Sequence, residues 1–549
     1  MQRPYPTMHH APSACRALAL ALCVFNPLRC LAADADPTVA QAPILLPSFI
    51  VSDTRLQWRY VATPEFELLS DASDATTTDL AAQLAAGLAV YRTLVPPGFP
   101  LQSEVPLMFI LDLRDPAEVL PGALRQTWVK SDRPRTVFTG GGSSYRDDDL
   151  AVLYLNFHTL AKDARGMHRM GDSVARNMLV ALLEGSAPRP PPWFLQATRF
   201  APPLRIERRE AQVSGILEKP VVPLAEVFVD WSLAAAGGAP SPADKAIARV
   251  YTSTLFVRWG LFADNSAHRD AYFKFVTRSA LEPTPTETLF AQCFGFDYTV
   301  GLEKLKAFRA EAAKTVTIDL RKLALPPLAP PAVRDATDAE ATRITAEWAR
   351  LAARQNPQID GALLSAAQRR LERGLEHAPH DPRLLAARGL LFLDQGDSVR
   401  AQPLLKTAIA ANVVRPRAYL EVARLGLVAA RAGPASADGK LSAAQIATIL
   451  DPLNRAYAQS LQMESFYALT AQTWQSAGAK PDRAQLAPLL EGVRRFPHNL
   501  DLAFKSAQLH ANHGYAEEAA ALIRAGLGSA PDERGKERFI ELQKTLPKR

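Results

Sequence analysis

A proline-rich stretch in the middle of the chain divides it into two parts with different patterns. Residues 324–333 read Ala-Leu-Pro-Pro-Leu-Ala-Pro-Pro-Ala-Val, which favours a semi-rigid, extended linker. Before this stretch, segments typical of strands and of helices alternate, whereas after it the pattern is almost wholly helical. Because 549 residues are too many for one hydrophobic core, we place a domain boundary here, in a linker covering residues 321–335.

The first part, residues 51–320, has the alternating pattern of an α/β or α+β domain. Apolar runs predict strands at 107–111 and 151–155, and leucines at spacings of three and four predict a helix from about 78 to 94. A second long helix is expected at 172–184, followed by an extended region to about 229. Further expected elements are strands at 58–62, 66–70 and 136–139, and helices beginning at 243 and covering 273–281, 286–294 and 302–313.

Residues 140–149, between two expected strands, are rich in glycine, serine and aspartate. No Gly-Lys-Ser/Thr follows the glycines, so the segment predicts a flexible hairpin and not a phosphate-binding loop. The three consecutive aspartates, Asp147, Asp148 and Asp149, are expected to form a solvated loop, since a calcium loop would need further spaced oxygen ligands.

The second part, residues 336–545, repeats its apolar pattern. Small and aromatic residues recur at the spacing of tetratricopeptide repeats, most completely at Gly389, Phe392, Ala401, Leu405 and Ala408. Whole or partial copies follow the same register at Ala367–Pro379, Ala471–Pro497 and Ala507–Pro531. The resemblance implies three or four degenerate helix pairs that hold a protein or peptide partner. An irregular helical bundle is the alternative, since any bundle has small and apolar residues at helical spacing.

The N-terminus has the order of a secretory signal peptide. Arg3 and Arg16 precede an apolar run over 17–25, and small residues follow up to Ala33. The run is far shorter than the roughly 20 residues that a membrane span needs, although retention as an anchor is the alternative. We therefore expect residues 1–33 to be a signal peptide, and the mature chain to be periplasmic or extracellular without a membrane span.

Charge and cysteine content narrow the classes of function. The net charge of +7 includes Arg3, Arg16 and Arg29 of the signal segment, so the mature chain is only weakly basic and gives little support for nucleic-acid binding. Three of the four cysteines also lie in that segment, which leaves Cys293 alone. An intramolecular disulfide and a cysteine-rich zinc site are therefore both excluded in the mature chain.

One segment of the first part resembles the gluzincin family of metallopeptidases. Residues 176–183 read Arg-Asn-Met-Leu-Val-Ala-Leu-Leu, and after a proline-rich stretch residues 191–197 read Pro-Pro-Trp-Phe-Leu-Gln-Ala. In that family, a helix carrying HExxH is followed by a proline-rich loop, a Pro-Trp and a glutamate that completes the zinc site. Segments 223–228, 251–259 and 290–297 are similar to its later helices, so the resemblance covers roughly residues 51–315.

The zinc-binding residues of that family are missing from this chain. In the frame of the resemblance, Arg176 stands at the first histidine, Asn177 at the glutamate base, Val180 at the second histidine and Gln196 at the third ligand. An arginine cation repels Zn²⁺, valine has no lone pair, and an amide is a poor replacement for a carboxylate. We therefore predict no cofactor and no zinc chemistry at these four positions.

Two hypotheses of function follow from the sequence. The first is a non-catalytic exported protein, in which an inactivated metallopeptidase-like domain precedes helical repeats that bind a protein. The second is a hydrolase that uses a relocated metal or catalytic site, with His158, His168 or carboxylates as its groups. The sequence favours the first, because the positions that would carry the chemistry hold arginine, asparagine, valine and glutamine.

Overall fold

A computed structural model provides the fold. It describes residues 57–99, 101, 105–112, 142–156, 173–201, 204–207, 210–228, 243–282, 286–323, 332–355, 360–433, 439–457, 459, 463–530 and 533–547. The predicted strand at 136–139, the predicted signal peptide, His158 and His168 lie outside these residues.

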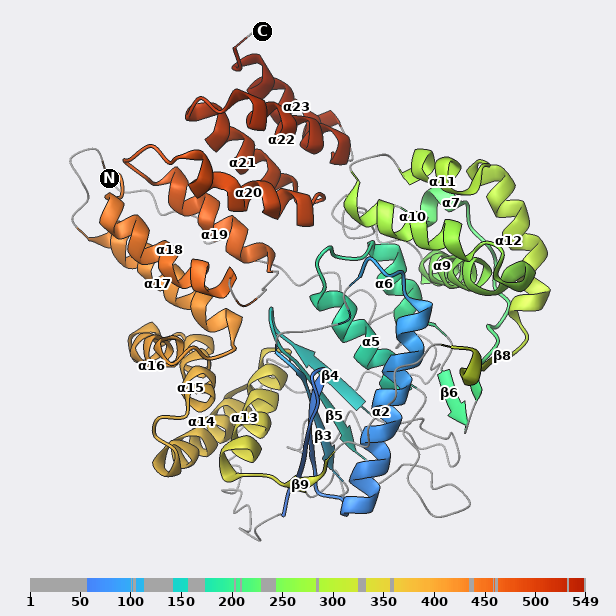
Figure 1. The fold of residues 1–549 in the computed structure, drawn as a ribbon, viewed down its shortest axis with the longest axis horizontal. Coiled ribbons are helices and arrows are strands. Elements are labelled where there is room, and N and C mark those ends of the chain that lie inside the picture. Colours follow the sequence, from blue (N-terminus) through green and yellow to red (C-terminus); the bar gives the residue numbers. More distant parts are fainter. Residues whose placement is uncertain are drawn as a thin grey trace, which may run out of the picture.

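Within the described residues, a six-stranded sheet in the order β4-β5-β3-β2-β1-β9 forms the centre of the first part (Figure 1). Its three middle strands, β5, β3 and β2, run parallel, whereas β4, β1 and β9 pair antiparallel to their neighbours. The strands are β1 (Arg59–Ala62), β2 (Phe66–Ser70), β3 (Leu107–Asp112), β4 (Gly142–Arg146), β5 (Ala151–Asn156) and β9 (Arg334–Asp335).

Both faces of this sheet are buried, each in a different core. Along β3, Leu107, Phe109 and Leu111 point to one core, and Met108 and Ile110 to the other. This alternation follows from the two-residue period of a strand. Continuous apolar runs such as Leu-Met-Phe-Ile-Leu are typical of strands that are covered on both sides.

Helices of the first part cover one face. The long helix α2 (Asp74–Leu94) and α5 (Ser173–Gly185) pack on it, followed by α6 (Pro192–Arg199), around a core of aromatic side chains at Trp193. The remaining elements are α7 (Leu224–Val227), α9 (Ala243–Phe262), η1 (Ala263–Ser266), α10 (Arg269–Leu281), α11 (Thr286–Phe294), α12 (Tyr298–Ala312) and η2 (Leu320–Lys322), with a small sheet of β6 (Leu204–Glu207), β7 (Glu210–Val213) and β8 (Val316–Asp319).

The other face is covered by α13 (Asp338–Gln355), the first helix after the proline-rich stretch. Trp348 of α13 stacks on Tyr154 of β5 with ring centroids 5.0 Å apart. The end of the predicted linker forms β9, which pairs with β1. The sheet and the first repeat helix therefore share one hydrophobic core.

Five helix pairs and a final helix make up the second part as far as the structure describes it. The pairs are α13 with α14 (Asp360–His377), α15 (Pro382–Asp394) with α16 (Ser398–Ala410), α17 (Pro416–Ala432) with α18 (Ala443–Tyr457), α19 (Glu464–Gln475) with α20 (Arg483–Arg495), and α21 (Leu500–Asn512) with α22 (Ala516–Ser529), followed by α23 (Glu533–Lys544). Successive odd-numbered helices contact one another, so they form a continuous layer, which we call the inner layer (Figure 1).

The pairs α15–α16 and α21–α22 show why this part is a repeat. A Cβ atom at Gly389 would lie only 2.6 Å from Leu405, so the two helices of that pair can approach closely because position 389 lacks a side chain. The turns of both pairs contain a glycine with positive φ, Gly396 at 82° and Gly514 at 83°. The same helical-repeat register at two distant places confirms the predicted repeats, although the number of pairs exceeds the three or four predicted.

Several predicted elements need correction. The helix α2 begins at Asp74, before residue 78, because the Ser73 hydroxyl accepts a hydrogen bond from the Thr76 amide and caps it. The helix α6 was not predicted from the pattern, because its eight residues begin at Pro192, a residue that favours the first helical turn as well as a loop. Residues 142–146, expected within a turn-rich stretch, form the edge strand β4, in which Tyr145 is buried.

Candidate functional site

The four positions that the resemblance assigns to a zinc site lie on α5 and α6. Arg176, Asn177 and Val180 occupy neighbouring positions of α5, and Gln196 lies on α6, which packs against α5. The helix α5 forms here because Met178, Leu179, Leu182 and Leu183 give it a buried apolar face. The positions 176 and 180 are one helical turn apart, which is the spacing that two metal ligands on a helix need.

Arg176 is partly buried and is hydrogen-bonded within the protein. Its Nη1 donates a hydrogen bond to the carbonyl oxygen of Ala201, just after α6, at 2.7 Å. Burial lowers the pKa of the Arg176 guanidinium, and Tyr91 of α2 opposes that shift. The Arg176 Nε and the Gln196 Oε1 are buried and have no hydrogen-bond partner among the described residues. The site therefore holds a partly buried cation and an amide.

Metal ligands are not gathered elsewhere in the described part of the chain. No group of three or more histidine, cysteine, aspartate or glutamate side chains that could hold a metal ion occurs among those residues. Within the same residues, no helix is both long and apolar enough to cross a membrane.

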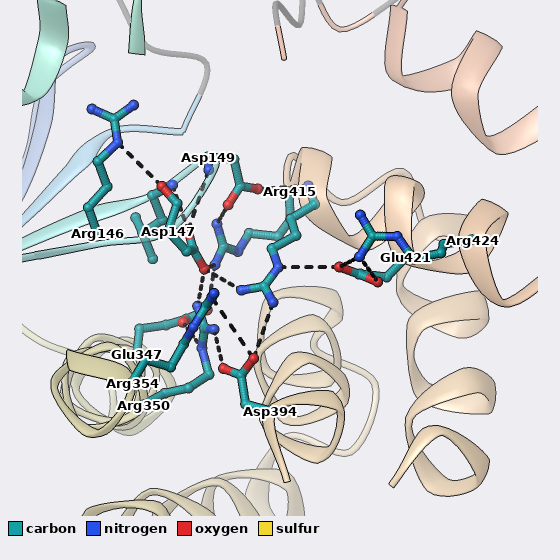
Figure 2. A network of polar contacts seen from close by, with 12 residues as sticks. Arg146, Asp147, Asp149, Glu347, Arg350, Arg354, Asp394, Arg415, Glu421 and Arg424 are labelled. Carbon is teal, nitrogen blue, oxygen red and sulfur yellow. Dashed lines mark hydrogen bonds and ion pairs between the residues drawn. The ribbon is translucent and has the colours of Figure 1, made fainter. Parts of the chain in front are cut away.

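A cluster of buried charged side chains lies between the sheet and the repeats, where the sequence predicted a solvated loop (Figure 2). The turn between β4 and β5 brings Asp147 and Asp149 against the inner layer, and neither carboxylate is exposed. Asp147 forms ion pairs with Arg350 of α13, with Arg415, and with Arg417 of α17, the last at 2.8 Å. The expectation of a solvated loop is wrong because the three arginines come from distant parts of the sequence.

Two further carboxylates complete this cluster, which we call the junction network. Arg350 binds Glu347 at 2.8 Å through Nε and Asp394 of α15 at 2.7 Å through Nη1. Arg417 reaches the same Asp394 at 3.1 Å, so each guanidinium bridges two acids. Figure 2 shows Asp147 and Asp149 meeting Glu347 and Arg350 of α13, Asp394 of α15, and Arg415 just before α17.

The pKa values of the two aspartates of the turn are shifted in opposite directions. Burial by itself would raise the pKa of Asp147, but Arg350, Arg415 and Arg417 hold it well below its usual value. Burial raises the pKa of Asp149 to about 7 against the pull of Arg415, and the neighbouring Asp147 adds to the rise. Two carboxyl groups with separated pKa values are typical of acid–base catalysis. These two have no access to a substrate, however, because both side chains are fully buried under the protein's own arginines.

A second polar contact joins the sheet to α13. Arg343 donates to Glu67 of β2 at 2.7 Å, and the Tyr60 hydroxyl donates to the same carboxylate. Burial, followed by the effect of Glu67, raises the pKa of Tyr60 above its usual range. All three side chains are buried, so α13 is bound to the sheet by specific pairs at both ends.

The loop between α5 and α6 also touches the repeats. Arg189 lies 3.6 Å from Glu464 of α19, and Ala187 belongs to the apolar core around Tyr467. Near α21, the His498 ring is 3.0 Å from the carbonyl oxygen of Ser279 in α10. The inner layer therefore contacts the first part along much of its length.

Comparison with known proteins adds little. No family model and no curated protein matches the sequence. Among solved structures, the chain is similar to a thermophilic TPR protein from Thermus thermophilus, with 18% identity over 36% of this chain and 98% of that one, and a TM-score of 0.25. A TM-score of 0.25 is too low to establish a shared fold, so the repeat architecture rests on the helix pairs described above.

Proposed function

We propose that the chain is a non-catalytic, exported binding protein in which an inactivated metallopeptidase-like domain is joined to helical repeats that bind a protein partner. The observation that carries the proposal is the hydrogen bond that holds Arg176 within the protein. A guanidinium that is hydrogen-bonded between α5 and the end of α6 occupies the position of the first zinc ligand, and its charge opposes a metal ion there.

The arrangement of α5 and α6 supports the metallopeptidase-like origin of this domain. The helix α5 is followed by a proline-rich loop, and α6 begins at Pro192-Trp193 and carries Gln196 one turn later. This is the order of helix, loop and third-ligand helix that the family uses. The contact between α5 and α6 brings the two helices together, as a shared zinc site would require.

The repeats support the binding half of the proposal. Stacked helix pairs build an extended surface from short units, and such surfaces commonly hold proteins or peptides. The turn of Asp147 and Asp149 occupies α13 at Arg350 and the beginning of α17 at Arg415 and Arg417. We therefore expect the partner to use surfaces away from this turn, including the exposed apolar residues Val399 of α16 and Val428 near the C-terminal end of α17.

Restoring the zinc ligands tests the inactivated site. In the variant Arg176→His, Asn177→Glu, Val180→His and Gln196→Glu, we expect stoichiometric zinc by elemental analysis, whereas the wild-type protein binds none. A variant with only Asn177→Glu and Gln196→Glu is the control and is expected to bind no zinc. Failure of the four-residue variant to bind zinc, while it stays folded by circular dichroism, would contradict the assignment of these positions.

Site-specific crosslinking tests partner binding. A photo-activatable amino acid at Val399 or Val428 should capture the same protein from the native cell envelope, because both side chains are exposed on the repeats. The same amino acid at Leu217, which is 83% exposed in the first part, is the matched control. Equal capture at all three positions would argue against a partner of the repeats.

The position at which the mature chain begins tests whether the protein is exported. Sequencing of the protein from the periplasmic or extracellular fraction should find a chain that begins close to residue 34. An intact N-terminus in the membrane fraction would instead favour a retained anchor.

A further inference from the structure

In the turn between β4 and β5, every carboxylate oxygen of Asp147 and Asp149 accepts a hydrogen bond or forms an ion pair. Asp147 Oδ1 accepts a hydrogen bond from the Leu150 amide at 3.0 Å, and its Oδ2 faces the arginines. Asp149 Oδ1 binds Arg415, and its Oδ2 accepts the amide of Arg417 at 2.8 Å, in the first turn of α17. The turn is therefore attached both to the side chains of the inner layer and to the beginning of one of its helices.

The buried charges of the junction network do not balance. Three guanidiniums, Arg350, Arg415 and Arg417, face four carboxylates, and all seven side chains are at most 8% exposed. The four carboxylates are Asp147, Asp149, Glu347 and Asp394. With every group ionised, one negative charge would be buried without a partner, which is costly.

The charges at the rim do not supply the missing cation. Glu421 lies 3.6 Å from Arg417 but is bound by Arg424 at 3.0 Å, and Arg354 lies 4.0 Å from Asp394 and is 43% exposed. Within the turn itself, Asp148 is exposed, and Arg146 points to the carbonyl oxygen of Ala181 and to Glu184. The rim therefore adds about as much negative as positive charge.

Asp149 is the carboxylate with the fewest cations around it. Asp147 contacts three guanidiniums, and Glu347 and Asp394 contact at least two each. Asp149 contacts Arg415 alone and otherwise accepts a neutral backbone amide. The unbalanced charge is therefore located at Asp149, where a proton would neutralise it.

We propose that the junction network is a proton-operated lock, in which a proton held at Asp149 fastens the β4–β5 turn to the inner layer and loss of that proton loosens it. Release of the turn would uncover Arg350 on α13, and Arg415 and Arg417 at the beginning of α17. The lock depends on neither a metal site nor a known partner.

The pKa of Asp149 places this change in an accessible range. Burial raises it to about 7 from an ordinary value of 3.8, so the folded junction binds the proton more tightly than the open one. The contribution of this proton to closure is therefore complete below about pH 4, decreases as the pH rises toward 7, and levels off above 7. Asp147 does not contribute in this range, because its pKa lies well below 3.8.

Hydrogen–deuterium exchange on the full chain tests the lock. Peptides covering 142–156 and the beginning of α17 should report a roughly tenfold rise in the opening equilibrium between pH 6 and pH 8, after correction for intrinsic exchange. In Asp149→Asn, which imitates the protonated form, the opening should not depend on pH. Asp148→Asn alters the exposed neighbour and should behave as the wild-type protein does.

Two results would overturn the proposal. The first is opening of the wild-type junction that does not change between pH 6 and pH 8, a result that needs no variant. The second is an Asp149→Asn protein that fails to fold or opens faster at both pH values, since this would show that Asp149 acts as a permanently ionised partner of Arg415.

Discussion

The two faces of the six-stranded sheet are packed in different ways. Toward α5, the contacts are mainly apolar, and the ion pair Arg146–Glu184 stays 23% and 22% exposed. Toward α13, the ion pair Arg350–Asp147 is 1% and 0% exposed. Apolar packing tolerates many residues of similar size, whereas buried ion pairs need both partners. On the face that joins the repeats, the position of α13 therefore depends on particular pairs of residues.

The largest effect is expected from removing the central arginine of the junction network. Arg350→Met leaves Asp147, Glu347 and Asp394 without their shared cation, so the free energy of unfolding should fall by about 5 kcal/mol. Unfolding in guanidinium chloride, followed by circular dichroism, measures this loss of stability. Arg354→Met, at the exposed rim, should change it by less than about 0.5 kcal/mol. Equal losses in both variants would show that the buried ion pairs of this face contribute no more than an exposed one.

On the apolar face, a cavity should cost slightly less. Trp193 is 2% exposed and contacts Phe228, Phe256 and Phe275, so Trp193→Ala should lower the free energy of unfolding by about 4 kcal/mol. Because no charge is uncovered, the loss should be the same at low and high salt. A clear dependence on salt would show that this face is not mainly apolar.

A double-mutant cycle on Arg343 and Glu67 measures how strongly a second buried ion pair on the α13 face depends on both of its partners. Arg343→Met alone should cost about 3 kcal/mol, because Glu67 stays buried with only the Tyr60 hydroxyl as a partner. Adding Glu67→Gln removes the stranded charge, so the double variant should lose about 1 to 3 kcal/mol less than the sum of the two single losses. Additive losses in this cycle would mean that the two residues act independently.

The smallest effect concerns acid stability at β9. Arg334 and the Thr337 amide stabilise the charged form of Glu340 against the effect of burial and lower its pKa from 4.5 to about 2. Since the folded-state pKa is depressed, this stabilisation is present above about pH 4.5 and is lost as the pH falls toward 2. Arg334 is half exposed, so we expect a loss on the order of 1 kcal/mol. Thermal melts at pH 5 and pH 3 should show a smaller loss for Glu340→Gln than for the wild-type protein.

The strands, helices and repeats that depend on residues close together in the sequence could be predicted from it. The strands at 107–111 and 151–155 carry continuous apolar runs, and the helix at 286–294 was predicted with its observed ends. The repeats follow from small residues such as Gly389, whose missing side chain lets Leu405 approach. Patterns of this kind depend on neighbours in sequence, so one chain is sufficient to read them.

The junction network could not be predicted in the same way. Asp147 is about 200 residues from Arg350 and 270 from Arg417, and nothing near the three aspartates indicates an arginine partner. One signal was present: Arg350 lies among Ala349, Leu351 and Ala352, on the buried part of α13. An arginine at an apolar helical position implies a buried acid, but the sequence does not say which one.

Zinc content of the mature protein tests the account most directly. Elemental analysis of residues 34–549 after mild dialysis should find no stoichiometric zinc, because Arg176, Asn177, Val180 and Gln196 offer no suitable set of ligands. Stoichiometric zinc would contradict the non-catalytic account and direct attention to His158 and His168.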